Sequence, residues 1–342
     1  FNMASGGQAP EALTDAVYER SKTLSGYRIA EIDLPGLAET GTYVLEELQV
    51  DIVDPVAAYA ELMRKLFDFP RIKAMLAGER RIHFDALNAV TGPYAERIFC
   101  DELGAPRSCL NHTQPLEDFG GLHPDPNPVD AEHLLKLAMS KAAPDLIAAS
   151  DGDGDRNMIL GPGLMVSPGD SLAILLEHCR HIPGYAHGVP GVARSMPTAR
   201  AVDAVAALQG IPCFETPTGW RFFSNLIDAG KIGLCGEESF GTSSSHAGEK
   251  DGLWAVLFWL NLMAALNQSV DEIVHAHWAK HGRCFFQRHD YFIADTAQAK
   301  ALIDDLNERV GGLAGSSHAG QRIQSADIFN YTDPVDHSVS RN

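Results

Sequence analysis

Regular alternation of predicted strands and helices is the feature that most constrains this fold. Short apolar stretches at residues 81–86, 108–112 and 145–150 read as strands, and segments with helical apolar spacing separate them. The same pattern restarts at residue 191 and runs to residue 266. Strands that alternate with helices of about 10 to 15 residues indicate βαβ units on a parallel sheet. We therefore predict an α/β fold, with consecutive α/β domains whose sheets are mixed and mostly parallel.

Chain length and the limits of this alternation set the expected domains. A chain of 342 residues exceeds the roughly 250–300 residues at which a single core stops growing. We assign residues 54–185 to one α/β domain and residues 186–267 to the next. Residues 1–53 read as the remainder of a preceding domain, and residues 268–342 as the start of an α+β domain. The chain is therefore expected to be a piece of a longer protein.

Composition excludes some classes of function. The net charge of −18 argues against nucleic acid or an anionic membrane as a partner. The longest apolar run, residues 253–266, is shorter than the roughly 18 residues of a membrane span and predicts a buried core helix. The six cysteines form no CxxC pair, which favours free thiols in a reducing, cytoplasmic compartment. Oligomeric state is expected to be monomer or weak dimer.

The most informative loop is "SDGDGDR", residues 150–156, which follows a predicted strand. Asp151, Asp153 and Asp155 alternate with glycines that allow a tight turn, and Arg156 follows them. Three carboxylates on one such turn repel each other, so a divalent cation is the expected partner. Hard oxygen donors favour Mg²⁺ and leave coordination positions for a phosphate oxygen. Arg156 is expected to contact that phosphoryl group through its planar donors.

Two other interpretations compete for this loop. A calcium EF-hand needs glycine at its sixth position and glutamate at its twelfth, but Arg156 and Pro162 stand there, so that interpretation fails. A solvated acidic turn without a ligand is the structural alternative. Phosphoryl chemistry is the prediction that accounts for both the carboxylates and the arginine.

Further polar loops follow predicted strands on the same sheet edge. Ligands of parallel α/β sheets bind beyond the carboxyl ends of the strands. "TPTGW" (216–220) and "GEESFG" (236–241) lie there, so Glu237 and Ser239 are candidates to bind sugar hydroxyls. The structural alternative for both loops is helix capping, with Thr218, Ser239 or Glu238 binding free backbone amides. Lys250 precedes a predicted helix, where a lysine is usually solvated.

Six stretches in order carry a family resemblance that covers nearly the whole chain: "PLEDFGGLHPDPN", "SDGDGDRNMILG", "ARSMPT", "ETPTGW", "LCGEESFGT" and "EKDGLWAVLFWLN". Together they resemble phosphoglucomutase of the α-D-phosphohexomutase superfamily. The resemblance implies a four-domain intramolecular phosphotransferase. Such an enzyme interconverts glucose 1-phosphate and glucose 6-phosphate through a phosphoserine and glucose 1,6-bisphosphate, and it requires Mg²⁺. The implied partner is therefore a phosphosugar.

The resemblance also implies a role for each matched residue. Asp151, Asp153 and Asp155 would hold one Mg²⁺ per chain. Arg156 would contact the transferred phosphoryl group, and Lys250 would lie near the reacting end of the substrate. The sugar-binding positions would be Thr218, Gly219, Glu237 and Ser239.

Departures from the family pattern keep a second function open. The family's serine loop would lie upstream of residue 1 and its phosphate loop beyond residue 342, so these 342 residues alone are expected to be inactive. Arg221, Gly248 and His337 stand where the family commonly has lysine, arginine and glycine. These departures favour the alternative of an inactive phosphoglucomutase-like scaffold. A Mg²⁺-dependent phosphatase is a further rival, but its aspartates belong after the first strand of a domain, whereas this loop follows a later one.

Overall fold

The two alternating blocks each form a mixed sheet. The computed structural model describes residues 2–29, 36, 39–285, 287, 289 and 291–341. The first sheet has the strand order β4-β3-β5-β6-β7 and the second the order β11-β10-β8-β9. The first sheet comprises β3 (Ile82–Asp85), β4 (Leu110–Asn111), β5 (Leu146–Ser150), β6 (Asn157–Gly161) and β7 (Leu164–Met165). The second comprises β8 (Val192–Ser195), β9 (Cys213–Thr216), β10 (Leu234–Gly236) and β11 (Thr242–Ser244). The predicted mixed α/β fold is confirmed.

Strand direction explains where the polar loops lie. β3 pairs in parallel with β4 and β5, and β8 pairs in parallel with β9 and β10. The later strands β6, β7 and β11 are antiparallel additions at the sheet edges. The parallel strands of each sheet therefore end on one side, and the aspartate loop follows β5 there. The loops at residues 217–219 and 237–241 follow β9 and β10 in the same way.

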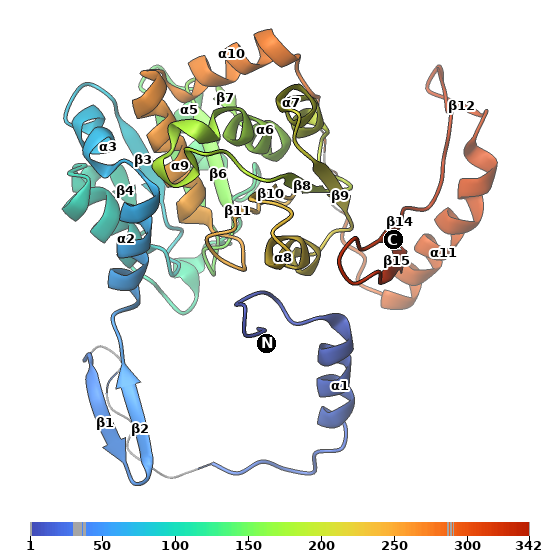
Figure 1. Ribbon diagram of the computed structural model, residues 1–342, viewed down its shortest axis with the longest axis horizontal. Helices are drawn as coiled ribbons and strands as arrows, with labels where there is room; N and C mark the ends of the chain where they lie inside the picture. Colours follow the sequence, from blue (N-terminus) through green and yellow to red (C-terminus); the bar gives the residue numbers. More distant parts are fainter. Residues whose placement is uncertain are drawn as a thin grey trace.

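Helices cover both sheets, and one of them joins the two cores (Figure 1). Those flanking the sheets are α2 (Pro55–Leu66), α3 (Phe69–Leu76), α4 (Gly92–Ala95), α5 (Glu132–Ala138), α6 (Pro168–His178), α7 (Ala201–Gln209) and α8 (Trp220–Asp228). The helical segment between the predicted strands 81–86 and 108–112 begins as α4 and continues as a π-helix over Glu96–Glu102. The core helix is α9 (Gly252–Leu266), which is followed by α10 (Val270–His281).

α9 is buried because it is apolar on all sides. Twelve of its residues are buried, and it contacts α3, β5 and β6 of one block and β11 of the other. Asp251 caps its start, and Asn267 in the left-handed region ends it. One continuous hydrophobic cluster therefore runs from Phe84 of the first sheet to Leu234 of the second.

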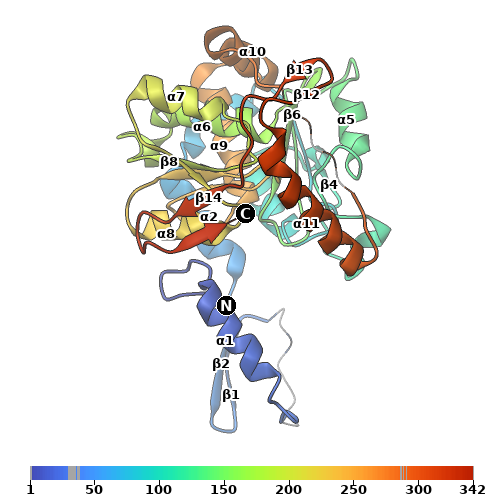
Figure 2. The same cartoon turned by 90° about the vertical axis from the view of Figure 1, so that its right-hand side faces the viewer.

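The two ends of the chain lie outside this body (Figures 1 and 2). The N-terminal part holds α1 (Glu11–Ser21), β1 (Gly41–Leu45) and β2 (Leu48–Ile52). The C-terminal part holds α11 (Thr296–Leu313), β12 (Ser317–His318), β13 (Gln321–Arg322), β14 (Asn330–Thr332) and β15 (Val339–Arg341). The hairpin β14–β15 packs on α8, where the rings of Phe222 and Tyr331 meet edge to face.

The stretch 284–293, whose residues are typical of a strand, forms none at its described positions, and residues 286, 288 and 290 lie outside them. The domain limits at residues 53, 185 and 267 remain a prediction. α6, which precedes residue 185, contacts α7 and β10 of the second block.

In the part of the chain that the structure describes, no single helix is long and apolar enough to cross a membrane. Among the described residues, one helix pair, α9–α10, reaches that length and apolarity together, and it is bent by 79°.

Candidate functional site

The three aspartates of the loop after β5 converge as predicted. One carboxylate oxygen from each of Asp151, Asp153 and Asp155 lies within 4.8 Å of the others. Asp151 is 2% exposed, whereas Asp153 is open to solvent. Gly154 has φ of 81°, and a Cβ there would lie 2.6 Å from Thr91, so this tight turn requires glycine. The loop presents a cluster of oxygen donors with one open side.

Two positively charged side chains contact this cluster of carboxylates. The Nε of Arg156 donates to Asp151 Oδ2 at 2.6 Å, and its Nη1 donates to Asp125 Oδ1 at 2.9 Å. Lys250 Nζ lies 2.9 Å from Asp155 Oδ2. Arg156 is therefore close enough to the aspartate loop to contact a phosphoryl group bound there. Lys250 is not a solvated lysine, because its side chain is only 17% exposed and is paired.

The aspartates differ in how completely their carboxylate oxygens are hydrogen-bonded. Burial raises the pKa of Asp151, but hydrogen bonds from Arg156 outweigh it and hold that pKa below its ordinary value. Burial, with the charges of Asp151 and Asp153, raises the pKa of Asp155 to about 6 despite the contact with Lys250. Asp155 Oδ1 is also buried without a hydrogen-bond partner among the described residues. A hard divalent cation bound to these oxygens would satisfy that atom, so the donor set fits Mg²⁺.

The loop after β10 gathers the predicted sugar-binding residues. Glu237 is 5% exposed, and its Oε1 accepts a hydrogen bond from the backbone amide of Gly219 at 3.1 Å. Ser239 Oγ lies 3.4 Å from the other carboxylate oxygen, and Thr218 is exposed beside Gly219. Burial raises the pKa of Glu237. Gly219 has φ of 130° at the start of α8, so the carboxylate holds a turn that favours glycine.

Among the described residues, α8 begins at Gly219 without a side-chain cap, so the capping alternative for Thr218 is not realised. Glu238 instead accepts from Ser195 Oγ at 2.7 Å and from Thr198 Oγ1 at 3.4 Å. Within the described chain, Ser239 is the one hydrogen-bond donor to the second oxygen of Glu237. Glu237 can therefore support α8 and still accept from a ligand.

Residues 240–252 link the two loops. Arg156 forms a β-bridge with Gly241, and the backbone amide of Asn157 donates to Phe240 O at 2.9 Å. The amide of Gly252 donates to Gly154 O at 3.0 Å. A Cβ on Gly241 would lie 2.4 Å from Lys250 and 3.5 Å from Glu237. The aspartate loop (residues 150–156) and the loop of Glu237 (the sugar-type loop, residues 237–241) are thus joined, with Lys250 between them.

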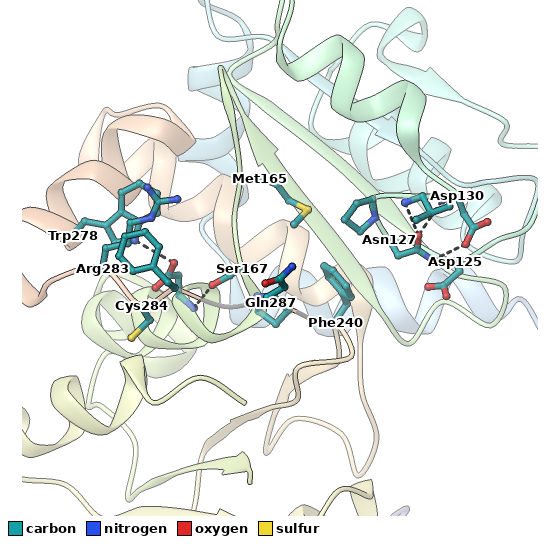
Figure 3. Close-up of a pocket in the computed structure, with 15 residues that line it drawn as sticks. Asp125, Asn127, Asp130, Met165, Ser167, Phe240, Trp278, Arg283, Cys284 and Gln287 are labelled. Atoms are coloured by element: carbon teal, nitrogen blue, oxygen red, sulfur yellow. Dashed lines mark hydrogen bonds between the residues drawn. The ribbon is translucent and has the colours of Figure 1, made fainter. Parts of the chain in front are cut away.

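Cavities and partners around the site were not predicted from the sequence. A cavity of about 270 Å³ borders Asp153, Asp155 and Lys250, and Tyr59 and Tyr94 line its other side. A larger cavity of about 840 Å³ is lined by Asp125, which pairs with Arg156, and by Phe240 (Figure 3). Asp125 belongs to the proline-rich stretch "HPDPNP", which was the only sequence signal for its role.

One of the three family departures, Gly248, has a structural account. A Cβ on Gly248 would lie 2.5 Å from the backbone nitrogen of Gly7, so glycine lets the N-terminal loop pack there. His337 has φ of 62°, a backbone conformation that favours glycine. The guanidinium of Arg221 lies over the ring of Phe222 at 4.8 Å. Nothing in these contacts explains why arginine replaces lysine at position 221.

Comparison with known families gives consecutive matches along the chain. Domain II of the phosphoglucomutase/phosphomannomutase family, an α/β/α domain, matches residues 57–163, and its domain III matches residues 168–281. The C-terminal domain of phosphoglucomutase-1 matches residues 283–342.

Individual relatives agree with these matches. The chain is 51% identical to a phosphoglucomutase of Rhizobium radiobacter over 342 residues, which are all of this chain and 63% of that protein. It is 46% identical to human phosphoglucomutase-1, again over the whole chain and over 64% of that protein. The solved open form of pp63/parafusin, a phosphoglucomutase from Paramecium, matches 98% of this chain and 62% of its own, with a TM-score of 0.87 and 42% identity. The chain therefore spans less than two thirds of these relatives.

Proposed function

The chain belongs to the phosphoglucomutase/phosphomannomutase family, and from this we propose that the full-length protein interconverts glucose 1-phosphate and glucose 6-phosphate. The observation that carries the proposal is the junction of two loops. The aspartate loop and the loop of Glu237 meet through residues 240–252. A phosphosugar needs a cation site beside a hydroxyl-binding site, and these two loops are our candidates for them.

We assign Mg²⁺ to Asp151, Asp153 and Asp155, one ion per chain. When bound, it neutralises charge on the phosphoryl oxygens. Arg156 keeps its contact with Asp125 and turns its remaining donors toward the phosphoryl group. Lys250, which pairs with Asp155, would contact the substrate if that carboxylate held the cation. Both side chains stabilise the charge of the group in transfer.

The sugar ring is assigned to the opposite loop. Glu237 accepts hydrogen bonds from ring hydroxyls through its carboxylate, whose position is fixed by the amide of Gly219. Ser239 and Thr218 present hydroxyls that donate or accept. Glucose 1,6-bisphosphate is the proposed intermediate, and its two phosphates require the sugar to bind in two orientations. Small hydroxyl groups and one carboxylate suit both orientations.

The remaining assignments rest on the family and on charge. A phosphosugar is the proposed substrate, and the net charge of −18 disfavours nucleic acid and anionic membranes as partners. We propose a cytoplasmic protein that is a monomer or a weak dimer. Residues 54–185 and 186–267 remain our proposal for the metal-binding and sugar-binding domains, with parts of a first and a fourth domain at the two ends.

The alternative of an inactive scaffold rested on the family departures. Gly248 packs closely on the N-terminal loop, and His337 occupies a strained turn far along the chain from the site residues. Neither substitution removes a carboxylate of the aspartate loop. The intact aspartates and the paired Lys250 favour the enzyme.

An assay of glucose 1-phosphate conversion by the full-length protein tests this proposal. With Mg²⁺ and glucose 1,6-bisphosphate present, we expect turnover, and Lys250→Met should lower kcat/KM by at least about a hundredfold. Lys136→Met is the matched control, because Lys136 is exposed and pairs only with Glu132 in the described structure. Wild-type protein without turnover would favour the scaffold. Full activity of Lys250→Met would refute the role of that lysine.

A further inference from the structure

A second group of metal-type ligands lies between α6 and α10. Glu177 is in the last turn of α6, and His277 and His281 are in α10. Because the two histidines are four residues apart, their rings share one face of the helix. In Figure 1, α10 runs along the top of the view above α6 and α7. None of these residues belongs to the aspartate loop or the sugar-type loop.

The three side chains converge in a nearly dry environment. Their exposed fractions are 7% for Glu177, 1% for His277 and 4% for His281. His277 Nδ1 lies 2.6 Å from Glu177 Oε2, and His281 Nε2 lies 3.0 Å from Oε1. One carboxylate oxygen and one nitrogen from each ring all lie within 4.8 Å of one another. Two imidazoles and a carboxylate are a ligand set that zinc sites use.

Within the described structure, hydrogen bonding accounts for only one of the four ring nitrogens, His277 Nδ1. His277 Nε2 and both nitrogens of His281 are buried without a hydrogen-bond partner in the described structure. His281 Nε2 is close to Glu177 Oε1 but is not aligned with it for a hydrogen bond. A nitrogen and an oxygen that lie close together without hydrogen-bond alignment are expected when both are ligands of the same cation. Buried polar atoms left unpaired are costly, so an unseen partner is indicated.

An ion cluster without a metal is the rival explanation. Lys280 Nζ lies 2.6 Å from Glu177 Oε1 and neutralises its charge. This contact leaves the unpaired nitrogens of His277 and His281 unexplained. The Lys280 side chain is 64% exposed, so it can turn into solvent and release the carboxylate. His178 Nε2 lies 3.9 Å from Glu177 Oε2 and offers a further nitrogen.

We propose that Glu177, His277 and His281 bind a late first-row divalent cation, with Zn²⁺ the preferred ion. Imidazole nitrogen selects such metals, whereas the all-oxygen aspartate loop suits Mg²⁺, so the two sites take different ions. Because the ligands are buried away from solvent, the ion has a structural role and not a catalytic one. The cation clamps the end of α10 to the end of α6, just before Gly282, where the chain leaves the helix. It is independent of the mutase proposal.

Cobalt titration of the 342-residue chain tests this site. With Mg²⁺ in excess to occupy the aspartate loop, Co²⁺ bound to imidazole at low coordination number gives a visible absorption band that an all-oxygen octahedral site lacks. We expect one absorbing Co²⁺ per chain, displaced by one equivalent of Zn²⁺. Zn²⁺ should also raise the melting temperature, because it binds only the folded state.

Variants separate the site from adventitious binding. Glu177→Gln and His281→Phe should abolish the band or weaken Co²⁺ binding by at least about tenfold. His281→Phe should melt no lower than wild type in chelator, since it removes unpaired nitrogens. His275→Gln, an exposed histidine on the same helix, should leave the band unchanged, and Lys280→Gln should keep or strengthen it. A wild-type chain without the band, or a band that survives in both ligand variants, would overturn the proposal.

Discussion

At the scale of single residues, the surroundings of each carboxylate decide its part in the site. Asp151 and Asp155 are two residues apart in one loop, yet Arg156 satisfies the first and the second keeps a buried oxygen unpaired. The sequence predicts the carboxylate cluster because its members are neighbours along the chain. It does not predict that Asp125 pairs with Arg156 or that Lys250 pairs with Asp155, because those contacts depend on tertiary packing.

Glu237→Gln tests whether Glu237 binds the sugar or only supports the start of α8. Glutamine keeps an oxygen that accepts from Gly219, so we expect the melting temperature to be unchanged or higher. Hydrogen bonds to charged groups contribute about 1.5–3 kcal/mol, so turnover by the full-length protein should fall about ten- to hundredfold. A large loss of melting temperature with unchanged turnover would instead make Glu237 a purely structural residue.

The same variant has a predicted pH dependence. Burial holds the pKa of Glu237 above its unfolded value, so the ionised carboxylate destabilises the fold. That cost is absent at low pH and appears as the pH rises through the folded pKa. The melting temperature of Glu237→Gln relative to wild type should therefore rise between about pH 5 and about pH 8. A constant difference over this range would show that burial of the charge carries no cost.

At the scale of elements, the start of α9 ties the core to the site. Asp251 Oδ1 accepts from the amide of Trp254 at 2.9 Å and from Tyr59 at 2.7 Å. Its Oδ2 lies 3.0 Å from His246 Nε2. Lys250 immediately precedes this cap, so the cap fixes where the chain places the lysine.

Asp251→Ala should therefore destabilise the chain. It removes the helix cap and leaves the hydroxyl of Tyr59 without its acceptor, so the free energy of unfolding should fall by about 1–3 kcal/mol. Asp251→Asn keeps a capping oxygen and should lose less. Urea unfolding followed by circular dichroism measures both variants. Equal stability of wild type and Asp251→Ala would contradict the role of the cap.

Elements differed in how far the sequence predicted them. Helices α7 and α8 were predictable because their apolar residues recur at helical spacing, and α9 because its long apolar run has the length of a buried helix. The change from α4 to a π-helix at Glu96 has no such signal in the sequence. Residues 284–293 have strand-type composition, but the described residues there pair with no neighbouring strand, and composition alone does not form a sheet.

At the scale of the whole molecule, α9 and one continuous core hold two sheets together so that their loops meet. The bridge from Arg156 to Gly241 is the point of contact. The sequence predicted both loops separately because each follows a parallel strand. Their junction required the packing of α9 between the sheets. The central claim is that the aspartate loop in this junction is a cation site.

Titration calorimetry with Mg²⁺ tests that claim most directly. We predict one Mg²⁺ per chain for wild type and for the control Glu117→Gln, which alters an exposed carboxylate outside the cluster. Asp153→Ala removes one of three converging carboxylates and should lose most of the binding. Its melting temperature should not fall, because Asp153 is exposed and its removal relieves charge repulsion. Equal Mg²⁺ affinity and stoichiometry in wild type and Asp153→Ala would contradict the account.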